Sequence, residues 1–340
     1  MAVPKVTVQQ IQWRPRLGRA PAPPPLFLIH DSSGLLFNYH LLDDLKRDVY
    51  GIADPLFGTE ERWHGGIPEM AREYVSAIQA TVGKGPIVIG GWSLGGMISI
   101  EMARVIRRSL STTTDVRGLI LIDTPNTQGW KALRSELDPF DLDLSKASPR
   151  VQQGVKRRFE LAEDLVYDWE FPGPSDLPTD YSVAESSKYF FGKGERSRLA
   201  ALKTDKELAL SLRLQQERCL LPPALLVRAT DLVKPDAESR ARVDLSRDQR
   251  MLGWEDHPVG FIRAVQDTSG HHYDLFEGGD RLIAVSQAIN GWCSILDEAW
   301  SSRSKGVMLN PAKTGVAEKK NIMMEKKLTA VVQEVPAFWI

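Results

Sequence analysis

Cysteine is scarce in this sequence, and its scarcity excludes several classes of protein. Cys219 and Cys293 are the only two among 340 residues. Two cysteines cannot form the disulfide framework of a small secreted domain, and they lack the paired spacing of a zinc or thiol redox site. We therefore expect the chain to hold neither a metal nor a cofactor of its own. We also expect it to be in a reducing compartment, the cytoplasm.

Long hydrophobic runs are also missing. No apolar run approaches the roughly 20 residues that cross a bilayer, and the first ten residues, MAVPKVTVQQ, lack the apolar stretch of a secretory signal. The sequence thus predicts an intracellular protein without a membrane partner.

An excess of charge of either sign is absent as well. Lys and Arg total 43 and Asp and Glu total 44, which leaves a net charge of -1. Such a chain has no overall field to attract a phosphate backbone or an anionic lipid surface, so nucleic acid is not an expected partner. The 42% of hydrophobic residues is enough to bury a large core in a chain of this length.

Short apolar runs alternate with helical patterns along most of the chain. This alternation predicts an α/β fold with a mostly parallel central sheet and helices on both faces. Between the second and third runs, apolar residues recur at helical spacing up to Val82, with Pro68 placed as the first helical residue. The expected strands are 26–30, 49–53, 87–91, 118–123, 224–228 and 261–265.

The alternation stops after Pro125, and the next strand pattern begins at Ala224. We interpret 126–221 as a helical lid insertion, because long insertions in compact domains are often functional; a helical subdomain that only packs on the sheet is the alternative. Two helical stretches, 151–169 and 199–220, flank a segment that contains a proline-rich loop. The aromatic residues of the insertion either line a pocket or pack internally: Trp169, Phe171, Tyr189 and Phe190.

The remaining division of the chain follows from composition. Residues 1–300 are expected to form the catalytic domain that carries the insertion. Residues 301–340 are polar and rich in lysine before a short apolar finish. We expect a mobile tail or a docking segment there.

The strongest motif is Gly-x-Ser-x-Gly at 91–95, which follows a buried strand pattern and precedes an apolar helical one. In that context the motif is the nucleophile elbow of the α/β-hydrolase fold, with Ser93 as the nucleophile. Any side chain at Gly91 or Gly95 would crowd the tight turn. The Leu94 N–H, at a helix N-terminus, is the expected first donor to an oxyanion.

A second oxyanion donor is expected from the turn after the first core strand, HDSSG at 30–34. Hydrolases of this fold place a backbone N–H there beside the elbow, and we assign it to Ser32. The same turn is also explained without catalysis, since Gly34 suits a positive φ and Asp31 suits a helix cap.

A serine hydroxyl needs a histidine to accept its proton and a carboxylate to orient that histidine. In this fold the histidine comes last in the chain, and the loop SGHHYDLF offers His271 and His272. We assign His272 as the general base from the register of the loop, with His271 as the alternative. The other histidines have a structural or surface role as their default interpretation: His30, His40, His64 and His257.

Two aspartates compete for the orienting role. Asp123 and Asp231 each follow a strand pattern, where active sites of α/β folds gather, and Asp236 is a remote third choice. The residues leave this choice open. The unused aspartate would be a helix cap or a turn former.

The chain resembles the thioesterase domains that end fungal polyketide synthases and peptide synthetases. The resemblance covers residues 26–292, and the elbow segment is its most specific part. The matching segments are PLFLIHDSSG, DVYGIADPLF, IPEMAREYVSAI, GPIVIGGWSLGGMISIEMAR, GLILIDTP and SGHHYDLF.

The resemblance implies a triad of Ser93, Asp123 and His272, with Asp231 demoted. It also implies an acyl-enzyme formed from a chain on the phosphopantetheine arm of an acyl carrier protein, followed by hydrolysis or cyclisation. Since the chain begins with its own Met and shows no Asp-Ser-Leu carrier motif, we expect it to act in trans on a carrier protein or polyketide synthase, or to be an excised domain. A carboxylesterase or lipase acting on oxygen esters is the main rival, and a non-catalytic binding protein is a second.

Overall fold

The computed structural model describes residues 5–14, 22–109, 114–136, 144, 147–171, 221–234, 240–255 and 260–301. The chain divides into two compact units, Met1–Ala299 and Trp300–Ile340. Of the second unit, only Trp300 and Ser301 are described. The predicted tail therefore lies outside the described residues.

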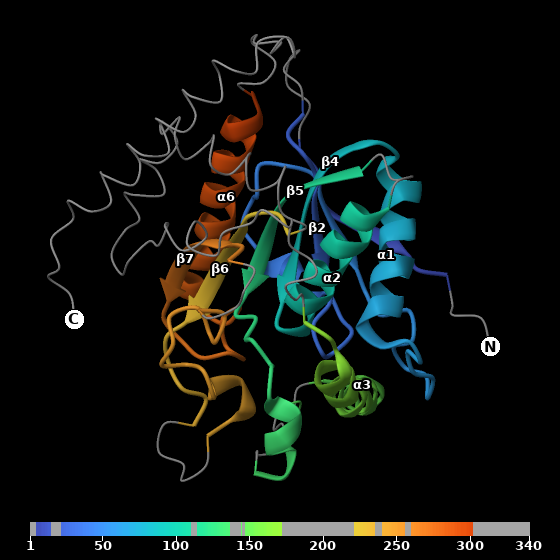
Figure 1. Cartoon of the computed structure of the whole chain (residues 1–340), viewed down its shortest axis with the longest axis vertical. Helices are drawn as coiled ribbons and strands as arrows, with labels where there is room; N and C mark the ends of the chain where they lie inside the picture. Colours follow the sequence, from blue (N-terminus) through green and yellow to red (C-terminus); the bar gives the residue numbers. More distant parts are fainter. Residues whose placement is uncertain are drawn as a thin grey trace, which may run out of the picture. The chain divides into compact units, whose positions relative to one another are not determined.

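A seven-stranded sheet forms the centre of the first unit (Figure 1). Its order is β1-β3-β2-β4-β5-β6-β7, with β1 antiparallel to β3 and all other neighbours parallel. The strands are β1 Val8–Gln12, β2 Leu26–Ile29, β3 Val49–Ile52, β4 Gly85–Trp92, β5 Thr114–Ile122, β6 Ala224–Ala229 and β7 Ile262–Thr268.

All six strands predicted from apolar runs are present, with bounds that differ by a few residues. These runs are continuous because a parallel sheet covered on both faces buries every residue of its strands. Strand β1 is not predicted from the sequence, because its residues VQQIQ are mostly polar. As an edge strand paired only with β3, β1 needs no apolar run.

Helices cover both faces of the sheet (Figure 1). Helices α1, Gly66–Val82, and α2, Leu94–Arg108, share one core cluster with alternate residues of β2, β4 and β5. Helix α6, Gly279–Ser301, packs on the other face, where Leu296 contacts the backbone of Gly118 in β5. The sheet is thus the middle layer of three, as the predicted fold class requires.

Helix α1 follows the predicted apolar spacing but begins two residues earlier than predicted. Ile67, Met70, Tyr74 and Ile78 are buried at spacings of three and four residues, which places them on one face. The helix begins at Gly66, so Pro68 is its third residue and not its first. A proline is tolerated there because the N–H groups of the first turn have no intrahelical acceptor.

The predicted insertion is described in part. It contains the 3-10 helix η2, Trp130–Glu136, and helix α3, Pro149–Asp168, which corresponds to the expected helix at 151–169. Trp169 and Phe171 pack against each other with ring centroids 4.6 Å apart. The expected helix at 199–220 and the residues Tyr189 and Phe190 lie outside the described residues, and the role of the insertion as a lid stays a prediction.

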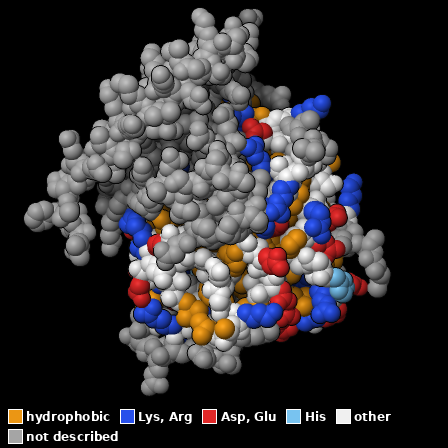
Figure 2. Space-filling model, viewed as in Figure 1, with side chains coloured by type: hydrophobic (Ala, Val, Ile, Leu, Met, Phe, Trp, Pro, Cys, Tyr) orange, Lys and Arg blue, Asp and Glu red, His pale blue; other side chains and the backbone are white. Residues whose placement is uncertain are grey.

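The arrowheads of β6 and β7 point towards the end of the sheet where α3 lies (Figure 1). On the face drawn in Figure 2, the described basic and acidic side chains are interspersed. Within the described ranges, every helix falls short of the length and apolar character that crossing a membrane requires. In the same ranges, no three His, Cys, Asp or Glu side chains are grouped so that they could hold a metal ion.

Candidate active site

Ser93 lies in the turn between β4 and α2, with φ 55° and ψ -120°. A non-glycine residue is rarely held in this region of backbone space, and such strain is concentrated at functional sites. The flanking glycines permit the turn. A Cβ at Gly95 would lie 2.3 Å from the carbonyl oxygen of Ile29, and one at Gly91 would lie 2.7 Å from the same atom.

Hydrogen bonds from neighbouring strands hold the turn in place. The Ser93 N–H donates to the Ile122 carbonyl at 2.9 Å, and the Thr124 hydroxyl donates to the Ser93 carbonyl at 3.2 Å. The buried Tyr39 hydroxyl accepts from the Trp92 N–H at 2.8 Å and donates to the last carbonyl of β2 at 2.7 Å. The strained serine is therefore supported from both adjacent strands.

His272 links Ser93 to Asp123. Its Nε2 lies 3.0 Å from Ser93 Oγ, and its Nδ1 lies 2.8 Å from Asp123 Oδ2. Since a carboxylate only accepts, Nδ1 carries the proton and Nε2 is free to accept the serine proton. His272 is 1% exposed, and the Trp92 ring packs beside it at 5.6 Å. This is the geometry of a nucleophile, a general base and an orienting acid.

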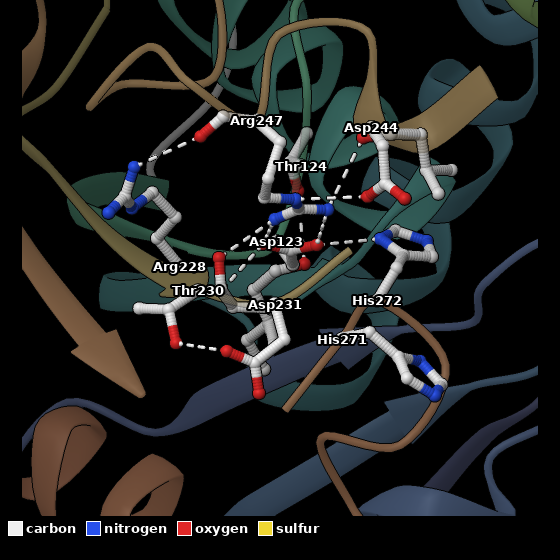
Figure 3. A network of polar contacts seen from close by, with 12 residues as sticks. Asp123, Thr124, Arg228, Thr230, Asp231, Asp244, Arg247, His271 and His272 are labelled. Carbon is white, nitrogen blue, oxygen red and sulfur yellow. Dashed lines mark hydrogen bonds and ion pairs between the residues drawn. The ribbon is translucent and has the colours of Figure 1, made fainter. Parts of the chain in front are cut away.

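Asp123 follows the last residue of β5 with φ 43° and is fully buried. Its Oδ1 accepts the Ala229 N–H at 2.8 Å. The Arg247 guanidinium donates to Oδ1 at 2.6 Å and to Oδ2 at 2.8 Å (Figure 3). Burial by itself would raise the pKa of Asp123, but the charge of Arg247 and the hydrogen bonds from His272 and Arg247 lower it well below its usual value.

Asp231 is engaged elsewhere. Its carboxylate accepts the Gly270 N–H at 2.8 Å and the Thr230 hydroxyl at 3.0 Å, and its own N–H donates to the Gly270 carbonyl at 2.9 Å. These contacts tie Asp231 to the loop that carries His272, as a turn-forming aspartate does. Asp236 lies outside the described residues.

The alternative base, His271, points away from Asp123 while His272 points towards it (Figure 3). The His271 N–H donates to Asp274 Oδ1 at 2.7 Å, and its Nε2 lies 3.5 Å from Asp274 Oδ2. His30 is a buried structural histidine whose Nε2 lies 2.8 Å from the Tyr74 hydroxyl. His257 lies outside the described residues.

The two expected oxyanion donors flank the serine. Leu94 is the first residue of α2, so its N–H has no acceptor within the helix. Ser32 borders the same cavity as Ser93, Leu94 and His272. Their action as donors, like the roles of the triad residues, stays a prediction.

A cavity of about 660 Å³ opens onto Ser93 and His272, and we call it the serine cavity. Helix α3 forms one wall of it through Val155, Phe159 and Val166. Met97 from α2 and Tyr273 from the histidine loop also line it. The lining mixes apolar side chains with charged ones, which are Lys156, Glu160, Glu163, Lys234 and Arg242. Such a mixed concave lining can hold a small molecule that has apolar and polar parts.

Two side chains of the network, Arg247 and Asp244, are not predicted from the sequence. They lie in the segment DLSRDQR, which has neither a motif nor an apolar period. Arg247 meets Asp123 across 124 positions of sequence, and no local signal marks such a pair. Tyr39, which links the end of β2 to the elbow, is missed for the same reason.

Comparison with known proteins places the chain in a family. A family model described as "Thioesterase domain" matches residues 24–162. "Probable thioesterase KK1J" of Curvularia clavata is 31% identical over 290 residues, which cover 81% of this chain and 91% of that protein. "Thioesterase frbD" of Dothideomycetidae sp. (strain 11243) is 31% identical over 302 residues, which cover 86% of this chain and 95% of that protein.

A solved structure of the "NocB thioesterase domain from Nocardicin cluster" matches with 20% identity and a TM-score of 0.47, over 79% of this chain and 92% of that one. This likeness is too low to bear on the function of the chain.

The fold, with a serine, a histidine and an aspartate meeting at the carboxyl ends of the strands, defines the class of α/β-hydrolases. Within that class the chain belongs to the thioesterase family. It is an enzyme, a thioesterase.

Proposed function

We propose that this thioesterase releases a polyketide-type acyl chain from the phosphopantetheine thioester of an acyl carrier protein or polyketide synthase acting in trans. Release proceeds through a Ser93 acyl-enzyme, by hydrolysis or by intramolecular cyclisation. The observation that carries the proposal is the continuous contact from Ser93 Oγ through His272 to Asp123, at 3.0 and 2.8 Å. The enzyme needs no cofactor of its own for this chemistry, because phosphopantetheine belongs to the substrate.

In the acylation step, the Ser93 hydroxyl passes its proton to His272 Nε2 while Oγ attacks the thioester carbonyl carbon. Asp123 stabilises the imidazolium that forms and keeps the Nδ1 proton in place. The N–H groups of Leu94 and Ser32 donate to the oxyanion of the tetrahedral intermediate. When the intermediate collapses, the carbon-sulfur bond breaks and His272 returns its proton to the departing thiolate.

In the release step, His272 accepts a proton from water or from a hydroxyl of the acyl chain, and the resulting oxygen nucleophile attacks the acyl-enzyme carbonyl. The ester bond to Ser93 breaks, and the serine recovers its proton from His272. Water produces a free acid, whereas an internal hydroxyl produces a lactone. The serine cavity has both apolar and charged lining residues, which suits an acyl chain that carries polar groups.

A second cavity supports delivery of the substrate on an arm. It has a volume of about 810 Å³ and meets the serine cavity at Ser32, Leu94 and Ala162. Its lining is more polar and includes the exposed Arg62 and Arg72. Arginines bind the phosphate of a phosphopantetheine arm, and the carboxylates of the same lining, among them Asp164 and Asp168, accept from its amide N–H groups.

The test is intact-mass spectrometry of the wild type and Ser93→Ala, each mixed with acyl-pantetheine thioesters or the matching p-nitrophenyl esters. We expect a mass increase of one acyl group on the wild type alone, faster from thioesters. The released product then shows whether the chain leaves as an acid or as a ring.

Other outcomes would overturn the proposal in distinct ways. Faster acylation by oxygen esters would favour a carboxylesterase or lipase. Acylation of Ser93→Ala to the same extent would remove Ser93 as the nucleophile. If neither ester type acylates the wild type and an acyl carrier protein does not restore acylation, the catalytic proposal fails.

A further inference from the structure

The Arg247 side chain is 3% exposed and fully occupied by acceptors around the triad acid. Its two terminal nitrogens donate to Asp123 at 2.6 and 2.8 Å, and also to the carbonyls of Ala229 and Val243 at 3.0 and 3.3 Å. Its Nε donates to Asp244 Oδ1 at 3.1 Å. A guanidinium has five N–H donors, and each of them has an acceptor here.

Asp244 completes the support behind the arginine. Its side chain is 1% exposed, and its second carboxylate oxygen accepts the Val233 N–H at 2.7 Å. A chain of contacts therefore runs from the Val233 backbone through Asp244, Arg247, Asp123 and His272 to the nucleophile. Figure 3 shows its middle part, from Asp244 to His272. A bidentate pair fixes the plane of a carboxylate as well as its distance, so Asp123 has one orientation available.

The charges of this network change during the proposed reaction. In the resting enzyme two carboxylates and one guanidinium leave a net charge of -1 beside a neutral imidazole. When His272 takes the serine proton, the network becomes neutral. Without Arg247, two buried carboxylates would lie beside the imidazole with no cation to offset their charge.

We propose that Arg247, backed by Asp244, is a positioning residue that holds Asp123 against His272 and limits the negative charge acting on the imidazole. The function is twofold: the two parallel hydrogen bonds fix the geometry of the acid, and the positive charge offsets the two carboxylates beside the imidazole. The inference rests on the triad part of the proposed function. It requires neither a carrier protein nor a particular acyl chain.

Other charged or titratable groups also face the imidazole. Asp31, in the turn after β2, interacts electrostatically with His272, and the Tyr273 ring packs on it with centroids 4.9 Å apart. Burial raises the pKa of Asp31 and that of Tyr273. Arg242, near Tyr273, pairs with Glu163 of α3 at 2.8 Å. Substitutions at Arg247 or Asp244 leave all of these groups in place, so their influence is common to every variant.

The experiment measures kcat/KM against pH, because its acidic limb reports the protonation of the base in the free enzyme. The substrate is any acyl-pantetheine or p-nitrophenyl ester that the wild type turns over. For Arg247→Met we expect a loss of about 100-fold in kcat and an acidic limb raised by about one pH unit. Arg247→Lys keeps the positive charge but cannot make the two parallel hydrogen bonds to Asp123. It should have a lower kcat, while the acidic limb of its pH profile stays near that of the wild type.

The sharpest outcome is a pair of opposite shifts. Asp244→Asn removes a negative charge behind Arg247, so its acidic limb should move down, by less than one unit. Arg47→Met is the matched control. The Arg47 side chain, just before the amino end of β3, is also 3% exposed, and it pairs with Asp297 at 2.8 Å. It should lower thermal stability without moving the limb.

An unchanged limb in Arg247→Met would overturn the inference, and so would shifts of the same sign in Arg247→Met and Asp244→Asn. If Arg247→Met fails to fold, the direction of the shift in Asp244→Asn decides. Failure of the proposed function has a separate signature, which is retention of turnover by Ser93→Ala.

Discussion

At the scale of single residues, Asp123 and Asp231 stand one strand apart and differ in what they contact. Asp123 accepts the Nδ1 proton of His272, whereas Asp231 binds the backbone of Gly270. The first contact acts on the protonation of the base, and the second acts on the shape of a loop. Substitution by asparagine, which keeps the size of the side chain and removes its charge, separates the two effects.

We expect Asp123→Asn to lower kcat by roughly 10,000-fold, because an amide can hold the imidazole in the wrong tautomer and cannot stabilise the imidazolium. Asp231→Asn should stay within about tenfold of the wild type, since its amide oxygen still accepts the Gly270 N–H. The measurement is the initial rate on one ester or thioester for both variants. The reverse ranking would move the role of the acid to Asp231.

At the scale of elements, α3 forms part of both cavities and is tied to the body of the protein by Arg158. This side chain is 4% exposed and donates to the carbonyls of Thr59 and Glu61 at 2.8 and 2.7 Å. It also pairs with the buried Asp54 at 3.3 Å. The segment after β3 therefore anchors the helix that borders the serine.

Arg158→Met should lower the melting temperature by about 10 °C, because it leaves Asp54 buried without its cation, at a cost of about 3–5 kcal/mol. It should also lower kcat/KM, since α3 loses its anchor. The neighbouring Arg157→Met is the control. Arg157 is 35% exposed and pairs with Glu60, so its loss should cost less than about 1 kcal/mol. Equal melting temperatures for the two variants would contradict the anchoring role.

At the scale of the whole molecule, buried carboxyl groups make the free energy of unfolding depend on pH. Burial raises the pKa of Asp31, although hydrogen bonds from Ser33 partly oppose this. An aspartate in the unfolded chain has a pKa of about 3.9. As pH rises above this value, Asp31 ionises in the unfolded chain before it ionises in the folded protein. The free energy of unfolding therefore falls until the pH passes the folded pKa of Asp31.

Asp31→Asn, which stays neutral in both states, should therefore gain stability over the wild type as pH rises from about 3.5 to 7. Urea unfolding at the two pH values measures the gain. Asp44→Asn is the control of opposite sign, because hydrogen bonds from Lys46 lower the pKa of that exposed carboxyl. An equal gain in the free energy of unfolding at both pH values would contradict this prediction. It would show that ionising Asp31 costs no more in the folded protein than in the unfolded chain.

The local features of the protein can be predicted from its amino-acid sequence. Six strands appear as apolar runs because both faces of the sheet are covered, and the elbow at Ser93 is marked by glycines that no larger residue can replace. The loop that carries His271 and His272 also follows from the sequence, since the order of the motifs along the chain predicts where a general base would lie. These features depend on neighbouring residues, whose spacing is visible in the sequence.

The features that join distant segments became visible in the three-dimensional structure alone. The residues left Asp123 and Asp231 as alternatives, and the structure brings Asp123 into contact with His272 across 149 positions. Arg247 and Asp244 have no motif, and β1 has no apolar run. The physical reason is common to all three cases: a buried ion pair or an edge-strand ladder depends on which segments the fold brings together, and no local period records that.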